Sequence, residues 1–590
     1  MKSSFRFLLI PLLAGIAAGL LSGCSGRVSP DPAAQTASVS EPSEDQPGNS
    51  ADVPSGETPE TPETEAPQAS GPSADSDPVS SSRFPKGRQA KTLVRIPEPS
   101  SYSEKLTLAT LQGLAARGSD EQILIRIGAA DLYTSYIEKQ WGAEISNRAG
   151  GKPATFDNLL AVYRESVGIE GYILCAADPE DESVSVAVSL AGILNTVVAT
   201  PDTEAAVKKA GYPLVLDVTG KDDKWLRASE YWDRLSRTAA FEQPASMAPK
   251  LIDYAVMANA YFNFYSGNNP AAHKRMYEFL DDGAVIFGYN NTLGEHETVK
   301  SFSDLNLQMV PSDHAYNLST LSGFSLAELL PKDPPAAEPA EEGKQVHTLC
   351  IVMSDGDNIQ WVLNNFATSN EWYGNSRRGD FAVGWGIAPS LIDVAAPMLS
   401  YLYDKATAKD GFLMQLSGLG YTFPSRWDAD CRREMAAEVA ESMRRCGLKY
   451  AEILDDNGFR EDSLGDFTAQ EDIEGLFYIE YCGYASLDGK ILWTNGKPTV
   501  SARYMIWADH PGGGLGYIAR KINRASVDPK EEDAYSFLIV HAWSGMKDGK
   551  LVPHGNTLDA AAELIAQLDE DVEIVTPEKF MERLIENCGP

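Results

Sequence analysis

Short apolar runs alternate with stretches of helical periodicity through the second half of the chain. The runs that predict strands lie at 347–353, 381–387, 411–416, 450–454, 476–481, 502–507, 537–541 and 572–575. Helices are expected at 390–405, 429–446 and 558–568, and a hairpin with a turn at 487–490 is expected over 485–500. Strands that alternate with helices favour a parallel sheet, and residues 344–590 have the length of a (β/α) barrel. We therefore predict a barrel-like (β/α) domain of seven or eight strands.

The first half of the chain has a less regular α/β pattern. Strands are predicted at 122–127, 171–174, 196–198, 214–218, 284–289 and 307–311, helices at 104–117 and 184–194, and a mainly helical stretch at 225–266. Small α/β domains should therefore precede the barrel: an N-terminal α/β domain over 89–222 and a helix-rich α/β region over 223–330. A linker rich in Pro, Ala and Glu at 331–343 leads to the C-terminal domain at 344–590.

The first 88 residues lack the pattern of a packed domain. Lys2 and Arg6 precede an apolar run over 7–21, which ends in Leu-Ser-Gly before Cys24. This order is typical of a lipoprotein signal peptide, residues 1–24, after which Cys24 becomes the lipid-bearing N-terminus. An uncleaved anchor helix is the alternative, although the apolar run is short for a membrane span.

Residues 25–88 are rich in Pro, Ser and Glu and are expected to form a disordered tether. The folded part is therefore predicted to lie outside the cytoplasm, anchored by lipid to the cell membrane and exposed at the surface.

Charge and cysteines narrow the classes of function. The formal net charge is −34 at pH 7, which argues against nucleic acid as a partner. The cysteines show no metal-site spacing, and Cys431 and Cys446 are a pair that an oxidising compartment would allow to bond. The sequence has no H-E-x-x-H zinc pattern, no G-x-S-x-G elbow and no Walker loop. No metal and no cofactor are predicted, and the oligomeric state is not set.

Polar residues follow the predicted strands at the end where barrel enzymes carry their chemistry. Five carboxylates hold such positions and are the candidate catalytic residues: Asp355, Asp357, Asp455, Asp456 and Glu480. Paired carboxylates are the usual means of glycoside hydrolysis. The simpler interpretation is that Asp-Gly and Asp-Asn pairs form turns, and that Asp357 or Asn358 caps the following helix.

Four residues in equivalent positions are candidate sugar contacts: Asn358, Trp385, His541 and Trp543. Amide, imidazole and indole groups offer hydrogen bonds and ring faces to a sugar. The alternative is that His541 and Trp385 are core residues.

One loop carries a motif that resembles a known family. Gly418, Gly420, Tyr421 and Phe423 lie in the segment GLGYTFP, residues 418–424, which is similar to the motif that names the GxGYxYP family. Four more segments resemble the family: LATLQGLAAR (108–117), SDGDN (354–358), HAWS (541–544) and VTPEKF (575–580). The resemblance thus covers about 90–590, and Phe423 stands where the motif has tyrosine.

The resemblance implies small α/β domains followed by a barrel-like domain, and an exported enzyme that acts on carbohydrate. The family's activity is itself inferred, and the resemblance assigns no catalytic residues. From the residues alone, the glycines allow a tight turn with its backbone close to a ligand, and Tyr421 and Phe423 offer ring faces. The alternative is that the glycines only shape the loop.

Three interpretations of function remain open on the sequence. The first is a glycoside hydrolase for oligo- or polysaccharide, in which a carboxylate of the 355–357 loop pairs with Asp456 or Glu480. The second is a metal-assisted hydrolase or deacetylase, in which the same loop and His541 or His510 hold an ion. The third is a carbohydrate-binding lipoprotein without catalysis.

Overall fold

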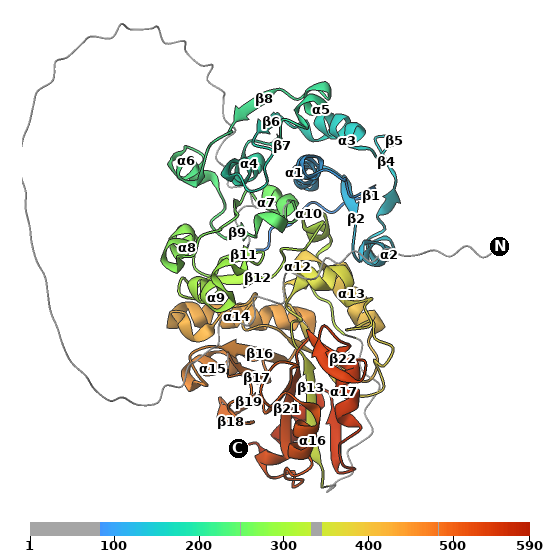
Figure 1. Ribbon diagram of the computed structural model, residues 1–590, viewed down its shortest axis with the longest axis vertical. Coiled ribbons are helices and arrows are strands. Elements are labelled where there is room, and N and C mark those ends of the chain that lie inside the picture. Colours follow the sequence, from blue (N-terminus) through green and yellow to red (C-terminus); the bar gives the residue numbers. More distant parts are fainter. Residues whose placement is uncertain (1–82, 248, 332–344, 482) are drawn as a thin grey trace, which may run out of the picture. The chain divides into compact units, whose positions relative to one another are not determined.

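The computed structural model describes residues 83–247, 249–331, 345–481 and 483–590. The predicted signal peptide with Cys24, nearly all of the tether and most of the 331–343 linker lie outside the described residues. Within the described ranges, no helix is both long and apolar enough to cross a membrane. The described chain forms three small parallel sheets in its first half and one large curled sheet in its second half (Figure 1).

The first small sheet has the order β2-β1-β3. Its strands are β1 (Thr92–Pro97), β2 (Glu121–Arg126) and β3 (Glu144–Ser146), and its helices are α1 (Tyr102–Gly118), α2 (Ala130–Trp141) and α3 (Phe156–Tyr163). The Ser101 side chain begins α1 by accepting the Glu104 N–H at 3.1 Å, as serine does at helix starts.

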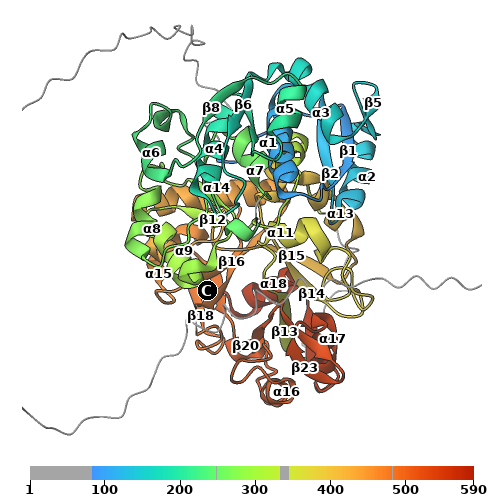
Figure 2. The ribbon, with the colours of Figure 1, turned by 45° about the horizontal axis from the view of Figure 1, so that its top comes forward.

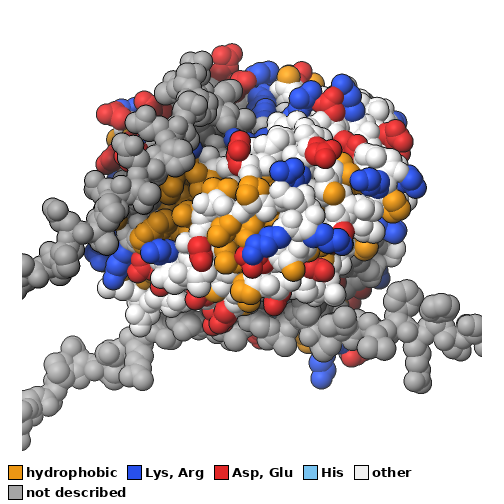
Figure 3. All heavy atoms as spheres, turned by 90° about the horizontal axis from the view of Figure 1, so that it is seen from above, with side chains coloured by type: hydrophobic (Ala, Val, Ile, Leu, Met, Phe, Trp, Pro, Cys, Tyr) orange, Lys and Arg blue, Asp and Glu red, His pale blue; other side chains and the backbone are white. Residues whose placement is uncertain are grey.

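The second small sheet has the order β7-β6-β8. Its elements are β6 (Gly171–Leu174), α4 (Glu182–Ile193), β7 (Thr196–Ala199), α5 (Glu204–Lys209), β8 (Leu214–Asp217) and α6 (Asp223–Ala228). The edge strand β8 leaves Leu214 and Val215 exposed. The view from above in Figure 3 shows hydrophobic side chains gathered on one area of the surface.

The third small sheet has the order β10-β9-β11-β12, with all strands parallel. Its elements are β9 (Ala239–Glu242), α7 (Ile252–Met257), β10 (Tyr261–Asn263), α8 (Pro270–Tyr277), β11 (Val285–Phe287), α9 (Glu295–Ser303) and β12 (Gln308–Val310). The prediction that 225–266 is mainly helical is wrong, because β9 and β10 lie within it. Both strands are short and fully buried, and such runs show no alternation that separates them from a buried helix.

The curled sheet of the second half contains all eight strands that the sequence predicted. They are β13 (His347–Met353), β14 (Val383–Ile387), β15 (Asp410–Met414), β16 (Tyr450–Asp455), β17 (Gly475–Glu480), β20 (Tyr504–Ile506), β21 (Tyr535–Val540) and β24 (Val572–Val575). Strands β13 to β17 lie side by side in chain order, and β21 and β20 continue on the other side of β13 (Figure 2). These strands confirm the barrel-like α/β fold class.

Helices connect these strands. They include α11 (Ile359–Trp361), α12 (Leu391–Val394), α13 (Ala396–Lys405), α14 (Ala429–Cys446), α15 (Glu461–Thr468), α16 (Leu515–Ile522), α17 (Thr557–Ile565) and α18 (Pro577–Cys588). The predicted helices at 390–405, 429–446 and 558–568 are confirmed.

One irregular segment joins the two sides of the curled sheet. Strand β19 (Lys497–Ser501) pairs in parallel with β17, and β20, which follows directly, pairs with β21. Between them, the Ala502 N–H donates to the Tyr478 carbonyl and the Arg503 N–H to the Phe537 carbonyl, both at 2.9 Å. Strand β24 pairs with the start of β13, while β14 pairs with its last two residues.

The expected hairpin over 485–500 is present but turns at a different place. Strands β18 (Ile491–Thr494) and β19 are antiparallel and are joined by Asn495 and Gly496, whose φ angles are +53° and +74°. An Asn-Gly pair with positive φ angles is the typical two-residue hairpin turn. The predicted turn at 487–490 precedes β18 instead.

Cys431 and Cys446 do not form the disulfide that the sequence allowed. They lie near opposite ends of helix α14 and both are free thiols. Fifteen helical residues separate them by about 22 Å, far beyond disulfide reach.

Candidate active site

The carboxyl ends of two parallel sheets meet at one place. Met309 in β12 and Tyr421, which follows β15, exchange two backbone hydrogen bonds of 2.9 and 2.6 Å. Glu295 begins the helix after β11, and its carboxyl accepts the Tyr421 hydroxyl at 2.9 Å. Asp355 follows β13, and its negative charge raises the pKa of Glu295. Barrels and open α/β sheets bind ligands at the carboxyl ends of their strands, so this joint is the candidate active site.

The two motif glycines are required by the contact between the sheets. A Cβ on Gly420 would lie 2.6 Å from the Met309 carbonyl oxygen, and one on Gly418 would lie 2.7 Å from Oε1 of Gln308. The same Gln308 oxygen accepts the Gly420 N–H at 3.1 Å. The glycines therefore bring the loop close to a neighbouring strand, β12, and their predicted contact with a ligand stays a prediction.

Phe423 packs in the interior of this joint. Its ring is fully buried and lies 5.8 Å from Tyr421, 5.3 Å from Tyr481 and 5.7 Å from His296, measured between ring centroids. Its backbone N–H donates to the Ser303 hydroxyl at 2.9 Å. The expectation that Phe423 stacks on a sugar is therefore wrong, because a fully buried ring cannot receive one.

Four carboxyl groups form an acidic cluster at the joint: Glu295, Asp355, Asp357 and Glu452. Asp355 has a φ angle of +65° and accepts a hydrogen bond from the Ser354 hydroxyl. Asp357 is 5% exposed and accepts the Asn358 side-chain amide at 3.3 Å. Burial, together with the charges of Asp355 and Glu295, raises the pKa of Asp357 to about 8. Asp357 therefore holds a proton at neutral pH.

Glu452 was not a candidate from the sequence. It lies in the middle of β16, is 1% exposed, and has a pKa raised to about 8, by burial first and then by the charges of Asp357 and Asp355. Its Oε1 accepts the Gln415 amide at 2.9 Å, and Oε1 of Gln415 accepts the Gly356 N–H at 2.8 Å. Gln415 thus ties Glu452 to the loop that carries Asp355. The sequence feature that could have identified Glu452 is a single glutamate inside an otherwise apolar strand.

Glu295 was also missed, because the search for carboxylates followed the barrel strands only. Burial and the neighbouring Asp355 raise the pKa of Glu295 to about 7, against the opposing effects of the Tyr421 hydroxyl and His296. The available signal was the acidic Glu-His-Glu segment at 295–297, which has the ordinary interpretation of a helix start. A carboxyl group with this pKa is half protonated at neutral pH and can give or take a proton.

Asp455 and Asp456 have their oxygens occupied. The Arg426 guanidinium donates to both oxygens of Asp456 at 2.7–3.0 Å, and His296 Nε2 lies 2.7 Å from Oδ2. Asp455 accepts the Ser425 N–H at 3.0 Å and its hydroxyl at 2.7 Å, and burial raises its pKa to about 6. Both residues hold the segment after the motif in place, and their catalytic role stays a prediction.

Glu480 lies at the end of β17 and is half-buried. It accepts the Tyr478 hydroxyl at 2.9 Å. Burial and the Asp456 charge raise the pKa of Glu480, against the Tyr478 hydrogen bond. Its catalytic role stays a prediction.

Aromatic side chains continue the site beyond the acidic cluster. His541 stacks on Trp507 with 4.0 Å between centroids, and Tyr484 meets the Trp507 ring edge-on at 4.9 Å. Burial lowers the pKa of His541, while the Asp355 charge acts in the opposite direction. Trp543 is half-buried and meets Trp361 at 5.0 Å. Sugar contacts by Asn358, His541 and Trp543 stay predictions, and Trp507 and Tyr484 join them as candidates.

Trp385 is a core residue, and its predicted sugar contact is wrong. It is 1% exposed, and its indole N–H donates to Oδ1 of Asp410 at 2.7 Å. Phe366 and Tyr373, from the connection between β13 and β14, pack on it at 5.8 and 5.1 Å.

The metal-assisted alternative needs a His and two carboxylates within reach of one ion. Among the residues that the structure describes, no three His, Cys, Asp or Glu side chains are grouped to hold a metal ion. His510 stacks on Trp507 at 5.6 Å, and its Nδ1 lies 2.9 Å from the Pro511 carbonyl oxygen.

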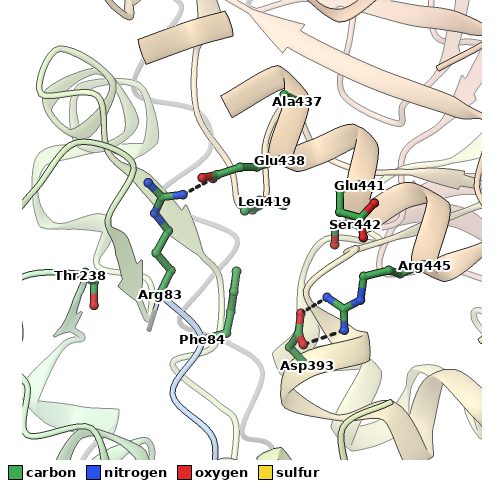
Figure 4. A pocket seen from close by; sticks show the side chains of 10 residues that line it. All are labelled: Arg83, Phe84, Thr238, Asp393, Leu419, Ala437, Glu438, Glu441, Ser442 and Arg445. Carbon is green, nitrogen blue, oxygen red and sulfur yellow. Dashed lines mark hydrogen bonds and ion pairs between the residues drawn. The ribbon is translucent and has the colours of Figure 1, made fainter. Parts of the chain in front are cut away.

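An open pocket of about 640 Å³ lies elsewhere, with Leu419 of the motif loop in its wall (Figure 4). Its charged side chains are paired: Arg83 with Glu438, Arg445 with Asp393 at 2.9 Å, and Glu441 with Arg444 at 2.8 Å. The pocket contains none of the carboxyl groups whose pKa is raised. The acidic cluster is therefore the better candidate for chemistry.

A curled (β/α) sheet with carboxyl groups clustered at the ends of its strands defines a hydrolase-like barrel protein. The chain belongs to the GxGYxYP family. The model of the "GxGYxYP putative glycoside hydrolase C-terminal domain" matches residues 345–584, that of the third domain matches 236–323, and that of the second N-terminal domain matches 169–235. The match at 236–323 contains the third small sheet, and the match at 169–235 contains the second.

One solved structure is similar over most of both chains. A putative hydrolase from Bacteroides thetaiotaomicron VPI-5482 is similar at 28% identity and a TM-score of 0.76, over 87% of this chain and 99% of that one. A 4-alpha-glucanotransferase from Thermococcus litoralis matches at 11% identity over 40% of each chain with a TM-score of 0.28, a likeness that supports no inference. No curated protein matches the chain.

Proposed function

We propose that this chain is an exported glycoside hydrolase, anchored by lipid at Cys24, that cleaves oligo- or polysaccharide with Asp355 and Glu295. The observation that carries the proposal is the joint between β12 and the motif loop, where the Tyr421 hydroxyl donates to Glu295 at 2.9 Å; burial and the adjacent Asp355 raise the pKa of Glu295 to about 7. Glycosidases need one carboxyl that is protonated and one that is charged at the working pH. The family's printed description and the hydrolase neighbour support the same reaction class.

Glu295 is the general acid in this proposal. It protonates the glycosidic oxygen while the bond to the anomeric carbon breaks. Asp355 faces the positive charge that develops on the sugar, as the nucleophile or as the base that activates water. Asp357 keeps its proton at neutral pH because its pKa is about 8, so it adds no second charge beside Asp355.

Glu295 takes the place that the sequence gave to Asp456 or Glu480. Both oxygens of Asp456 accept hydrogen bonds from the Arg426 guanidinium, so a substrate group could reach them only by breaking that pair. Glu295 has one hydrogen bond to a hydroxyl, which can turn away.

Turnover of glycosides by the full-length protein tests the proposal. Aryl glycosides and a panel of neutral polysaccharides are assayed with wild type, Asp355→Asn and Glu295→Gln. Loss of a general acid lowers the rate about 100- to 10,000-fold, and Asp355→Asn should lose at least as much. The matched controls are Glu297→Gln, on the same helix, and Asp509→Asn, an exposed rim carboxylate; both should keep wild-type rates.

The other interpretations are outcomes of the same assay. Turnover that disappears with a chelator and returns with a divalent ion would replace the paired-carboxylate mechanism by the metal-assisted one. Glycan binding without turnover would leave a carbohydrate-binding lipoprotein.

Lipid anchoring is tested separately. Cys24→Ser should move the protein from the membrane fraction to the soluble fraction, and mass spectrometry of the wild-type N-terminal peptide should show acyl chains such as palmitate on Cys24. An unmodified Cys24 in a membrane-bound protein would contradict this part of the proposal.

A further inference from the structure

A second group of polar and aromatic side chains adjoins the acidic cluster. Asp313 and His314 follow β12, Lys250 precedes α7, and Trp361 ends α11. His314 Nδ1 lies 3.3 Å from Lys250 Nζ, its Nε2 lies 3.7 Å from Asp313, and its ring stacks on Trp361 with 5.1 Å between centroids. We name these four residues the Lys250 cluster.

The Lys250 cluster is continuous with the acidic cluster. Gln360 accepts the His314 N–H at 3.0 Å and donates to Asn358 at 3.3 Å, and Asn358 donates to Asp357. On the other side, the pKa of Tyr289 is raised well above its ordinary value by burial and by the charges of Glu295, Asp313 and Asp355, so this tyrosine lies near both groups. A ligand bound at the acidic cluster would therefore have one end close to the Lys250 cluster.

Two polar atoms of the Lys250 cluster lack a hydrogen-bond partner in the part of the chain that the structure describes. Asp313 is 4% exposed, yet its Oδ1 has no hydrogen bond, and neither has His314 Nε2. Within the same described ranges, Lys250 has no carboxylate at ion-pair distance, although burial lowers its pKa. A buried polar group without a partner costs about 1–3 kcal/mol, and such groups accumulate where a ligand completes them.

Of the two unpartnered atoms, one is a donor (His314 Nε2–H) and one is an acceptor (Asp313 Oδ1). The Lys250 ammonium donates to His314 Nδ1, so the ring proton of the neutral imidazole is assigned to Nε2. Burial and Lys250 lower the pKa of His314 to about 4, which keeps the ring neutral at pH 7. The cluster thus offers an N–H, an ammonium and a carboxyl oxygen beside Trp361 and Trp543. Sugar hydroxyls both donate and accept, and indole rings pack on their C–H faces.

We propose that Lys250, Asp313, His314 and Trp361 form a second sugar-binding subsite, which makes the substrate a neutral oligosaccharide of at least two rings. The inference rests on the proposed glycosidase function and adds the length and charge class of the substrate. The subsite combines the Lys250 ammonium with the Asp313 carboxyl group and adjoins Asp355 of the acidic cluster, so a neutral sugar is favoured over an anionic one.

Chain-length dependence is the test. KM and kcat are measured on the full-length protein with p-nitrophenyl monosaccharides and with gluco-, xylo- and manno-oligosaccharides of two to six units. Lys250→Met and Asp313→Asn preserve side-chain volume and should raise KM for oligosaccharides about 10-fold while changing KM for the monosaccharides less than 2-fold. Lys209→Met, an exposed lysine on α5, is the matched control. An equal rise in KM for monosaccharides and oligosaccharides, or no rise for either, overturns the subsite.

Calorimetric binding separates this inference from the proposed function. Wild type and Lys250→Met are titrated with the same oligosaccharides in the Asp355→Asn background, where catalysis is silent. Binding that weakens about 10-fold in Lys250→Met supports the subsite even if no glycoside is turned over, in which case only the proposed hydrolysis fails. Binding that is independent of Lys250, or no binding of any neutral oligosaccharide, overturns the subsite. Because Lys250 is half-buried, this variant also serves if Asp313→Asn does not fold.

Discussion

Glu452→Gln removes a buried ionisable group with almost no change in side-chain shape. Glu452 is 1% exposed, and its pKa is raised from 4.5 to about 8. The folded chain therefore binds this proton more tightly than the unfolded chain does. The resulting stability is fully present below pH 4.5 and is lost as the pH rises through 8.

The magnitude follows from the two pKa values. As the pH rises from 6 to 9, ionisation of Glu452 should lower the free energy of unfolding of the wild-type chain by about 3 kcal/mol. The amide of Glu452→Gln cannot ionise, and its oxygen can still accept the Gln415 N–H that now lies 2.9 Å from Glu452. For a domain of the barrel's size, 1 kcal/mol corresponds to about 2–4 °C in Tm, so between pH 6 and pH 9 the Tm of Glu452→Gln should fall by about 6–12 °C less than the Tm of wild type.

Thermal unfolding followed by circular dichroism from pH 5 to pH 9 measures this difference. Glu563→Gln, an exposed glutamate on α17, is the control and should parallel wild type. The reasoning is refuted if the curves of Glu452→Gln and wild type are parallel, whatever their offset. Parallel curves would mean that Glu452 ionises as readily in the folded chain as in the unfolded one.

Two further substitutions test the joint between the sheets. Tyr421→Phe removes the hydroxyl whose hydrogen bond lowers the pKa of Glu295. The alkaline limb of the pH profile of kcat/KM is expected near pH 7 and should move to higher pH by about one unit in this variant. An unchanged limb would mean that Glu295 is not the acid. Gly420→Ala places a Cβ 2.6 Å from the Met309 carbonyl and should cost about 1–3 kcal/mol by thermal unfolding, whereas Gly514→Ala, with no atom within 4 Å, should not destabilise; equal stability of the two variants would contradict the docking role of the motif.

The local pattern of apolar and polar residues was sufficient to predict the barrel strands and part of the candidate site. Runs such as 347–353 and 450–454 are short, apolar and separated by amphipathic helices, and burial on both faces of a parallel strand produces that pattern directly. Because strand ends are local features, Asp355 and Asp357 could be placed at the rim from sequence. The same pattern could not separate β9 and β10 from helix, since both are only three or four residues long.

The remaining site residues depend on contacts between distant segments. Glu295 and Asp313 precede the barrel in sequence, and contacts between distant segments, such as the pairing of β12 with the segment after β15 and the hydrogen bond from the His314 N–H to Gln360, bring them to it. The failure at Trp385 has a related cause. The sequence shows that a tryptophan occupies a strand, but it does not show that the connection between β13 and β14 folds over that ring.

The motif that identifies the family acts mainly on the architecture of the site. Its glycines allow β12 to approach, its Phe423 fills the interior, and only Tyr421 sends a polar group toward the acidic cluster. A loop that docks a second sheet onto a barrel rim also decides which carboxyl groups can face Asp355. Glu295 comes from that docked sheet, so in the proposed mechanism the barrel by itself would supply Asp355 but not the general acid. The motif would then hold the two sheets in register at the site where both supply a carboxyl group.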